Sequence, residues 1–95
     1  MKQCVVQVQS QHHLDVIIGR VRSLGGALVY TKYLDIDNSN VYAQYTEYLR
    51  LGLPAFIKLD AWDSLRCMLY NHNCCCEVFH TVQDAIEYLG LSGSV

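Results

Sequence analysis

Apolar residues recur at helical spacing near the start of the chain, and this stripe constrains the fold more than any other feature. Positions i, i+3, i+4, i+7 and i+10 of one helix face are occupied by Leu14, Ile17, Ile18, Val21 and Leu24. The stripe is followed by Gly25 and Gly26, which commonly end a helix. Residues 3–9 and 27–33 are rich in β-branched residues and lie on either side. The pattern therefore predicts a strand, a helix and a second strand.

The next segment, residues 41–51, fits two structures. Its Tyr, Val and Thr content is typical of a strand, which would form a hairpin with the strand before it. The same segment places one set of residues on one side of a helix: Val41, Tyr45, Tyr48, Leu49 and Gly52. We favour the helix, because Gly52 follows a charged, leucine-containing turn and precedes an apolar run.

The rest of the chain continues the alternation of strands and helices. A strand is predicted over 53–59, and Asp60 with Asp63 resembles a helix cap and its partner. The helix that they open would turn three side chains inward: Leu65, Met68 and Leu69.

A fourth strand is predicted over 74–80, and Thr81 with Asp84 opens a last helix that ends at Gly90. Its apolar positions are at helical spacing: Val82, Ala85, Ile86 and Leu89.

This order predicts an α/β fold, with a four-stranded mainly parallel sheet and helices on its faces, as in flavodoxin-like domains. A strand over residues 41–51 would instead give a ferredoxin-like α+β fold with a 27–50 hairpin. The length of 95 residues suits one domain. We assign it to residues 1–91, with 92–95 as a loose tail.

Composition narrows the class of protein. The net charge is -2 and the seven basic residues are scattered, so we expect no nucleic acid partner. No apolar run approaches the roughly 18 residues of a membrane span, and the first residues lack the pattern of a secretory signal. We therefore expect no membrane partner and a cytoplasmic location. The five cysteines are an odd number, which favours free thiols, mostly buried, over a disulfide framework.

Two stretches resemble the STAS family, the anti-sigma factor antagonists and related modules. "ALVYTKYLDIDNSN" resembles the family's strand that ends in an Asp-Ser-Ser-Gly turn before a helix. "SLRCMLYNHNCCCEVFHTVQDAIEYL" resembles the closing helix, strand and helix. The likeness covers about residues 27–90 and implies a STAS-like fold with a regulatory role. It departs from the family at the turn, where Asn38 separates Asp37 from Ser39, the position nearest to the family's phosphorylated serine.

The carboxyl edge of a parallel sheet is the usual place for a ligand. The residues that would gather there are His12, His13, Asp35, Asp60 and His80. They could hold a small ligand, a phosphate or a divalent metal. Each also has a structural explanation, because Asp60 suits a helix cap and Asp35 a turn. We predict no specific metal ligands and no cofactor.

Seven tyrosines in 95 residues favour an interaction surface. Because no catalytic motif is present, the leading hypothesis is a small non-catalytic protein-interaction or regulatory module that binds a protein partner or forms a homodimer. Its surface would follow the "DIDNSN" turn, and the candidates are Asp37, Asn38, Ser39, Tyr42 and Tyr45. Small-ligand binding at the carboxyl edge is the alternative, and a thiol or hydrolytic enzyme using His80 or Cys76 is a third hypothesis.

The three adjacent cysteines at 74–76 suggest a metal site, but strand geometry argues against it. Side chains alternate across a strand, so Cys75 would point away from Cys74 and Cys76. His72 and His80 would lie beyond opposite ends of that strand, about 20 Å or more apart. We therefore expect the cysteines to be small core residues of a strand covered on both faces, with only His80 placed to meet a ligand.

Overall fold

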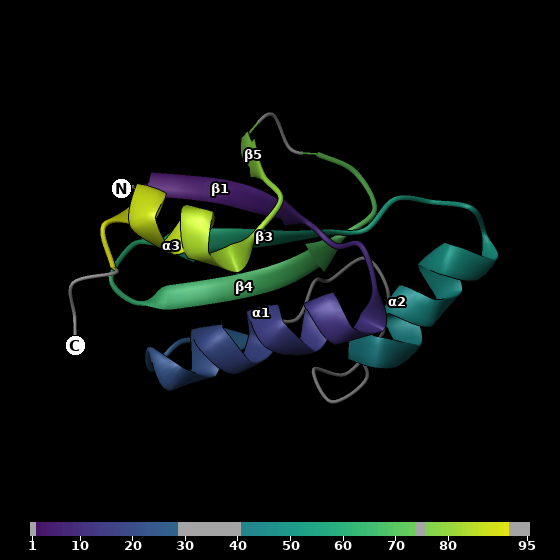
Figure 1. Ribbon diagram of the computed structural model, residues 1–95, viewed down its shortest axis with the longest axis horizontal. Coiled ribbons are helices and arrows are strands. Elements are labelled where there is room, and N and C mark those ends of the chain that lie inside the picture. The colour runs from purple at the N-terminus through teal and green to yellow at the C-terminus, as the bar shows by residue number, and fades with distance from the viewer. Residues whose placement is uncertain (1, 29–40, 74–75, 92–95) are drawn as a thin grey trace.

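The computed structural model describes residues 2–28, 41–73 and 76–91 (Figure 1). These contain five strands and three helices. In chain order they are β1 (Lys2–Gln7), α1 (Gln11–Ser23), β2 (Ala27–Leu28), α2 (Val41–Arg50), β3 (Phe56–Ala61), β4 (Leu65–Tyr70), β5 (Glu77–Phe79) and α3 (Val82–Leu89). The α/β class is therefore confirmed.

The five strands form one mixed sheet in the order β2-β4-β3-β1-β5. β3 is antiparallel to both of its neighbours, β1 and β4, whereas β1 pairs with β5 and β2 pairs with β4 in parallel. Four strands consequently run in one direction and β3 alone runs in the other. The carboxyl ends of β1, β2, β4 and β5 meet at one edge of the sheet, which we call the carboxyl edge.

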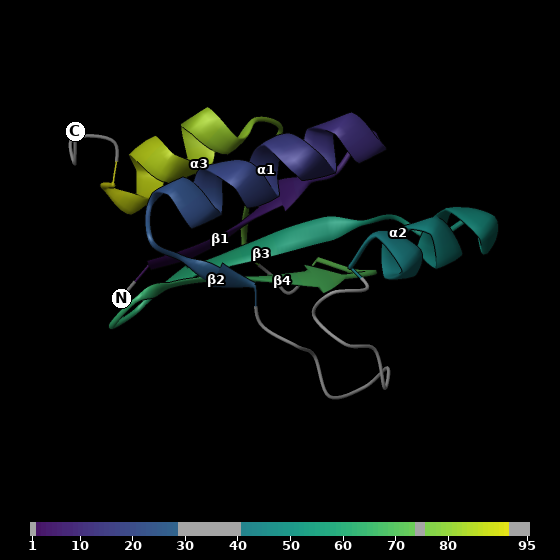
Figure 2. The same cartoon turned by 90° about the horizontal axis from the view of Figure 1, so that it is seen from below.

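The prediction of a four-stranded mainly parallel sheet is wrong, because α2 does not return the chain to the opposite end of the sheet. β2 ends at the carboxyl edge, and β3 begins there. α2 lies beyond that edge in both ribbon views (Figures 1 and 2). Gly52, with φ of +70°, ends this helix as predicted, and the amide of Leu53 donates to the carbonyl of Tyr48 at 2.9 Å.

Helices α1 and α3 both lie on one face of the sheet (Figure 2), whereas a flavodoxin-like domain carries helices on both faces. Within the described parts of the chain, no helix covers the opposite face. The ferredoxin-like alternative with a 27–50 hairpin is also wrong, since Val41–Arg50 is helical. The favoured helical interpretation of residues 41–51 is thereby confirmed.

The core lies between this pair of helices and the sheet, and α2 closes it at the carboxyl edge. From the sheet it takes Cys4, Val6, Ile57, Leu59, Leu65, Cys67 and Leu69, and from the helices Leu14, Ile17, Ile18, Val21, Val41, Tyr45, Tyr48, Val82, Ala85, Ile86 and Leu89. The stripes predicted for α1 and α3 supply much of this core. Ser10 accepts a hydrogen bond from the amide of His13, and Thr81 from the amide of Asp84, as expected of N-caps.

Gly26 lies in close contact with both α1 and the sheet. A Cβ atom at this position would lie 2.6 Å from Cγ1 of Val21, 2.9 Å from the carbonyl oxygen of Val21 and 3.0 Å from that of Leu65. Two of these three atoms belong to the backbone and cannot rotate away. A glycine is therefore required for β2 to leave α1 and pair with β4.

The helix predicted to contain Leu65, Met68 and Leu69 is instead strand β4. Its side chains alternate, with Leu65, Cys67 and Leu69 buried and the residues between them more exposed. The same apolar residues fit a period of two when Cys67 is counted as a hydrophobe.

Asp60 and Asp63 are therefore not helix caps. Asp60 lies in β3, and Asp63 lies in the short turn that joins β3 to β4. The two strands form an antiparallel hairpin.

The strand predicted over 74–80 is shorter, because β5 spans only Glu77–Phe79. It is an outermost strand of the sheet, and its residues Glu77 and Val78 are exposed. The expectation that this strand is covered on both faces is therefore wrong for its described part. Cys76 precedes the strand and is half-buried, whereas Cys74, Cys75 and the tail at 92–95 lie outside the described residues. Among the described helices, none is long and apolar enough to cross a membrane.

Candidate functional site

The sheet face opposite α1 and α3 carries no helix among the described residues, and we call it the open face. Val5 of β1, which lies on this face, is nevertheless fully buried. Paired residues of neighbouring strands share a face, and alternate residues of one strand lie on opposite faces. The register thus assigns this face to Gln3, Val5, Gln7, Ala27, Phe56, Lys58, Asp60, Arg66, Met68, Tyr70 and Val78.

Apolar and aromatic side chains make up about half of the open face. Phe56 and Tyr70 are directly paired across β3 and β4, and both are half-buried. The Tyr70 hydroxyl donates to Sδ of Met68 at 3.5 Å, and the Tyr70 ring meets His72 edge-on with centroids 5.7 Å apart. At the β5 end, Val78 is 37% exposed. A sheet face with such side chains and no helix over it has the composition of an interface core.

Charges of both signs lie on the open face, and two of them, Asp60 and Arg66, are close to the turn that joins β3 to β4. Asp60 is directly opposite Arg66 on β4 and two residues from Lys58 on its own strand. None of these three side chains forms an ion pair or side-chain hydrogen bond with another described residue. The Oδ1 atom of Asp60 is buried without a hydrogen-bond partner. An unsatisfied buried acceptor of this kind costs about 1–3 kcal/mol.

Only some of the residues predicted to bind a ligand lie at the carboxyl edge. His12 and His13 lie in the first turn of α1 after β1, and His80 follows β5, so these three reach the same edge. Asp60 does not, because β3 runs in the opposite direction and carries it toward the other edge. Asp35 lies outside the described residues. No group of three His, Cys, Asp or Glu residues close enough to hold a metal ion occurs in the described ranges.

His13 is held in place by the turn before α1. Its Nδ1 atom accepts a hydrogen bond from the amide of Gln9 at 3.1 Å, while its own amide donates to Ser10 at 3.0 Å. Burial lowers the pKa of His13, and neighbouring His12 lowers it further. The neutral imidazole is therefore favoured, with Nδ1 as an acceptor.

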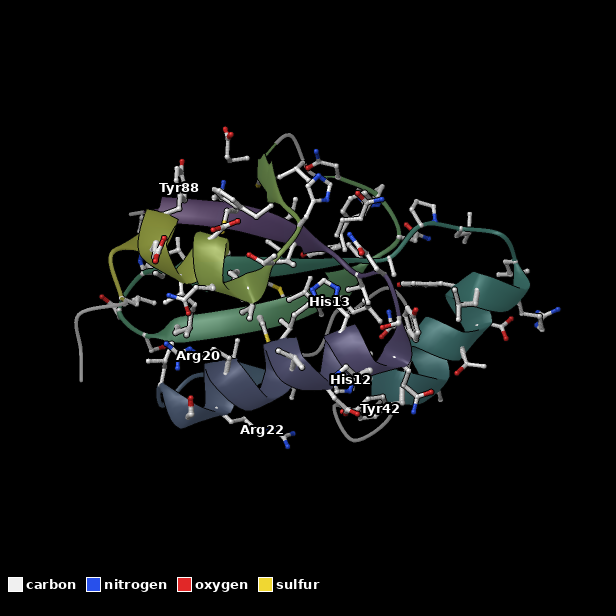
Figure 3. The ribbon with its side chains drawn as sticks, viewed as in Figure 1. His12, His13, Arg20, Arg22, Tyr42 and Tyr88 are labelled. Carbon is white, nitrogen blue, oxygen red and sulfur yellow. The ribbon has the colours of Figure 1, made fainter. Side chains whose placement is uncertain are left out.

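The tyrosines of α2 serve mainly to fix that helix. The Tyr42 hydroxyl donates a hydrogen bond to Asp15 of α1. That hydrogen bond raises the pKa of Tyr42, burial and the Asp15 charge act in the same direction, and Arg22 opposes them. In Figure 3, Tyr42 and His12 lie at the end of α1 nearest α2, away from Arg20 and Arg22.

Tyr45 is only 3% exposed, so this interaction candidate is a core residue and cannot contribute to a free surface. Tyr48 is also buried, as the helical pattern predicted, and accepts a hydrogen bond from Gln44 at 2.6 Å. Leu49, which the same pattern placed on the inner side, is 57% exposed. The candidates Asp37, Asn38 and Ser39 lie outside the described residues.

Cys4 and Cys67 are buried thiols of the core. Burial raises the pKa of Cys4 to about 12, and the nearby Cys76 and Glu77 add to this effect. Burial likewise raises the pKa of Cys67 to about 11. Both groups stay protonated at neutral pH, which is unfavourable for a thiolate nucleophile. The half-buried Cys76 donates its backbone amide to Oδ1 of Asn73 at 3.2 Å.

Comparisons with family models, with curated proteins and with solved structures find no match to this chain. The site therefore rests on its own geometry. The open face is not expected from the sequence when residues 65–70 are predicted to be a helix, as they are above. The available signal was the period-two alternation on both sides of the turn at Asp63, which a hairpin explains and two separate elements do not.

Proposed function

We propose that this protein is a non-catalytic protein-interaction module that binds its partner through the open face. The observation that carries the proposal is a five-stranded sheet with both flanking helices on one side and half-buried Phe56, Met68 and Tyr70 on the other. Interfaces are enriched in aromatic residues, methionine and arginine, and the open face holds all three kinds.

The class of function is the one expected from the sequence, but the binding surface is now the open face and no longer the region of α2. The earlier surface was centred on α2, where Tyr45 is buried and Tyr42 is bonded to Asp15. The open face is formed mainly by three long strands, so its backbone is rigid and its side chains are arranged before binding. Such preorganisation reduces the entropy lost on association.

A regulatory role of the STAS kind, a cytoplasmic location and the absence of nucleic acid and membrane partners remain part of the proposal. They rest on the sequence resemblance over residues 27–90 and on the scattered basic residues. The turn at Asp37 and Ser39, which carries the resemblance, can be tested directly. Phosphopeptide mapping of the protein purified from its own cells would detect a modified Ser39.

The interaction itself is tested by placing a photo-crosslinking amino acid on each side of the molecule. Replacing Tyr70 with p-benzoylphenylalanine puts the probe on the open face, and replacing Tyr88 puts it on α3. Both sites are aromatic and accessible, so the pair is matched. We expect protein adducts in living cells from the Tyr70 site and few from the Tyr88 site. Equal labelling at both sites, or none at the Tyr70 site, would contradict the proposal.

A second candidate function is small-ligand binding at the carboxyl edge. It is favoured because His12, His13 and His80 all lie at that edge. Imidazoles and the amides of a helix N-terminus suit an anionic group. Native mass spectrometry of the purified protein tests it. A retained small molecule that is lost in a His12→Ala and His80→Ala variant would favour this candidate over the open face.

A further inference from the structure

We infer that the turn into α1, residues 9–13, is a pH-sensitive switch: neutral His13 holds it closed, and protonation of His13 opens it in mild acid. The switch goes beyond the proposed function and does not depend on the open face, since the turn follows β1 at the carboxyl edge. It follows from the hydrogen bonds of the turn and from the position of His13 in the helix.

Two hydrogen bonds close the turn, and both involve His13. The amide of His13 donates to Oγ of the N-cap Ser10 at 3.0 Å, and the amide of Gln9 donates to Nδ1 of the His13 ring at 3.1 Å. The arrangement resembles a capping box, in which a Glu or Gln three residues after the cap accepts a hydrogen bond from the backbone at the helix start. Those side chains keep an acceptor oxygen in mild acid. An imidazole in the same position accepts only while it is neutral.

Protonation of His13 removes the acceptor, because both ring nitrogens then carry a proton. The proton on Nδ1 would face the amide proton of Gln9, so the hydrogen bond between them is lost. The new positive charge also lies in the first turn of α1, where the helix dipole favours anions and disfavours cations. The first turn of α1 has no acidic residue that could offset this charge.

The surroundings of the His13 ring act in the same direction. Burial lowers the pKa of His13, and the adjacent His12 lowers it further (Figure 3). The neutral form is therefore the one that the fold stabilises. The closed turn contributes fully to stability above the usual histidine pKa of about 6.5, and this contribution is lost as the pH falls below it.

No described carboxylate forms an ion pair with His13 that would stabilise its cation. Asp15 of α1 accepts the hydroxyl of Tyr42 instead, and Glu47 of α2 pairs with Arg50. The groups near this edge that carry or gain a charge between about pH 5 and pH 7.5 are, besides His12 and His13, Asp15, Glu47, Arg50, His72, His80 and Asp84.

The opening is confined to the turn, because the chain is fixed on both sides of it. Leu14, the next residue of α1, is fully buried. On the other side, the amide of Val8 donates to the carbonyl of Ala55 at 2.9 Å, which ties the end of β1 to the residue before β3. Mild acid should therefore release the turn at the carboxyl edge and leave the sheet intact.

NMR spectroscopy of the whole chain at about pH 7.5 and about pH 5 tests the inference, because this range brackets the usual pKa of histidine. At the higher pH we expect a neutral His13 ring with its proton on Nε2 and none on Nδ1. At the lower pH both nitrogens should be protonated. The protection factor of the Gln9 amide against hydrogen exchange should then fall by about three- to tenfold, as expected for the loss of one hydrogen bond at a helix cap. Amides of the central strand β3 should keep their protection.

Two variants separate the switch from a general effect of acid. His13→Gln places a side chain that does not titrate at the same helical position, so the pH dependence of Gln9 protection should disappear. His80→Gln removes another histidine of the carboxyl edge and should leave the opening in acid unchanged.

Unchanged Gln9 protection between the two pH values in the natural chain would overturn the inference. An equal fall in His13→Gln, or a proton on Nδ1 of His13 at about pH 7.5, would overturn it as well. A parallel loss of protection in β3 would show that acid unfolds the whole domain, which also contradicts a local switch. None of these results bears on the open face, so the proposed function is tested separately by the crosslinking probes.

Discussion

Two neighbouring substitutions test whether residues 65–70 form strand β4 or a helix. Cys67 faces the core and is fully buried, whereas Met68 lies on the half-exposed open face. Cys67→Ser buries a hydroxyl among apolar side chains, which should lower the free energy of unfolding by about 1–3 kcal/mol. Met68→Gln leaves the new amide accessible to water and should cost less than about 1 kcal/mol. In a domain of this size, 2 kcal/mol corresponds to a melting temperature roughly 8–16 °C lower.

Guanidinium chloride unfolding, followed by circular dichroism, measures both changes in the free energy of unfolding. The transition midpoints should shift while the slopes stay constant, because neither change alters the surface exposed on unfolding. A helix with Met68 and Leu69 inward would reverse the order, and Met68→Gln would then be the more damaging change. Equal effects of the two substitutions would likewise refute the strand assignment.

Three further predictions concern the glycines, the contact between two helices and a buried thiol. Gly26→Ala should destabilise the folded protein by about 1–3 kcal/mol, because the added Cβ meets backbone atoms. Gly19→Ala, on the exposed side of α1, should stabilise it by about 0.5–1 kcal/mol. Thermal unfolding of the two variants measures both changes. Tyr42→Phe removes the hydrogen bond to Asp15 and should cost about 0.5–1.5 kcal/mol, with faster amide exchange confined mainly to α2. The unfolded chain loses the Cys4 proton near pH 9, but the folded chain keeps it to about pH 12, so Cys4 alone should lower stability above pH 9 by up to about 1.4 kcal/mol per pH unit, and Cys67 should add to this fall. Cys4→Ala should reduce that slope, and an unchanged slope would contradict it.

The helices were predictable because their signals are local. The stripe beginning at Leu14 and the cap at Thr81 each lie within one element, and both correspond to observed helices. The identity of residues 65–70 was harder, because Leu65 and Leu69 are compatible with either period. Cys67 favours the strand period over the helical period, provided that it is counted as a buried hydrophobic residue.

The candidate site was predictable only in part. His12, His13 and His80 follow strands that run in the same direction, so the rule for parallel sheets places them at one edge. Asp60 departs from the rule, because β3 is antiparallel and carries it toward the other edge. Tyr45 appeared suitable for a surface because its aromatic character is equally common in cores and interfaces.

Local sequence is sufficient to specify α1, α3 and the apolar character of the core, since hydrogen bonds within a helix join residues four positions apart. Strand partners and strand direction depend on residues far apart in the chain, such as Cys4 with Leu59 and Leu28 with Cys67. Pairing between such distant residues leaves no periodic signal at either site. The position of α2 beyond the sheet and the order of the strands within the sheet were therefore decided only when the chain packed.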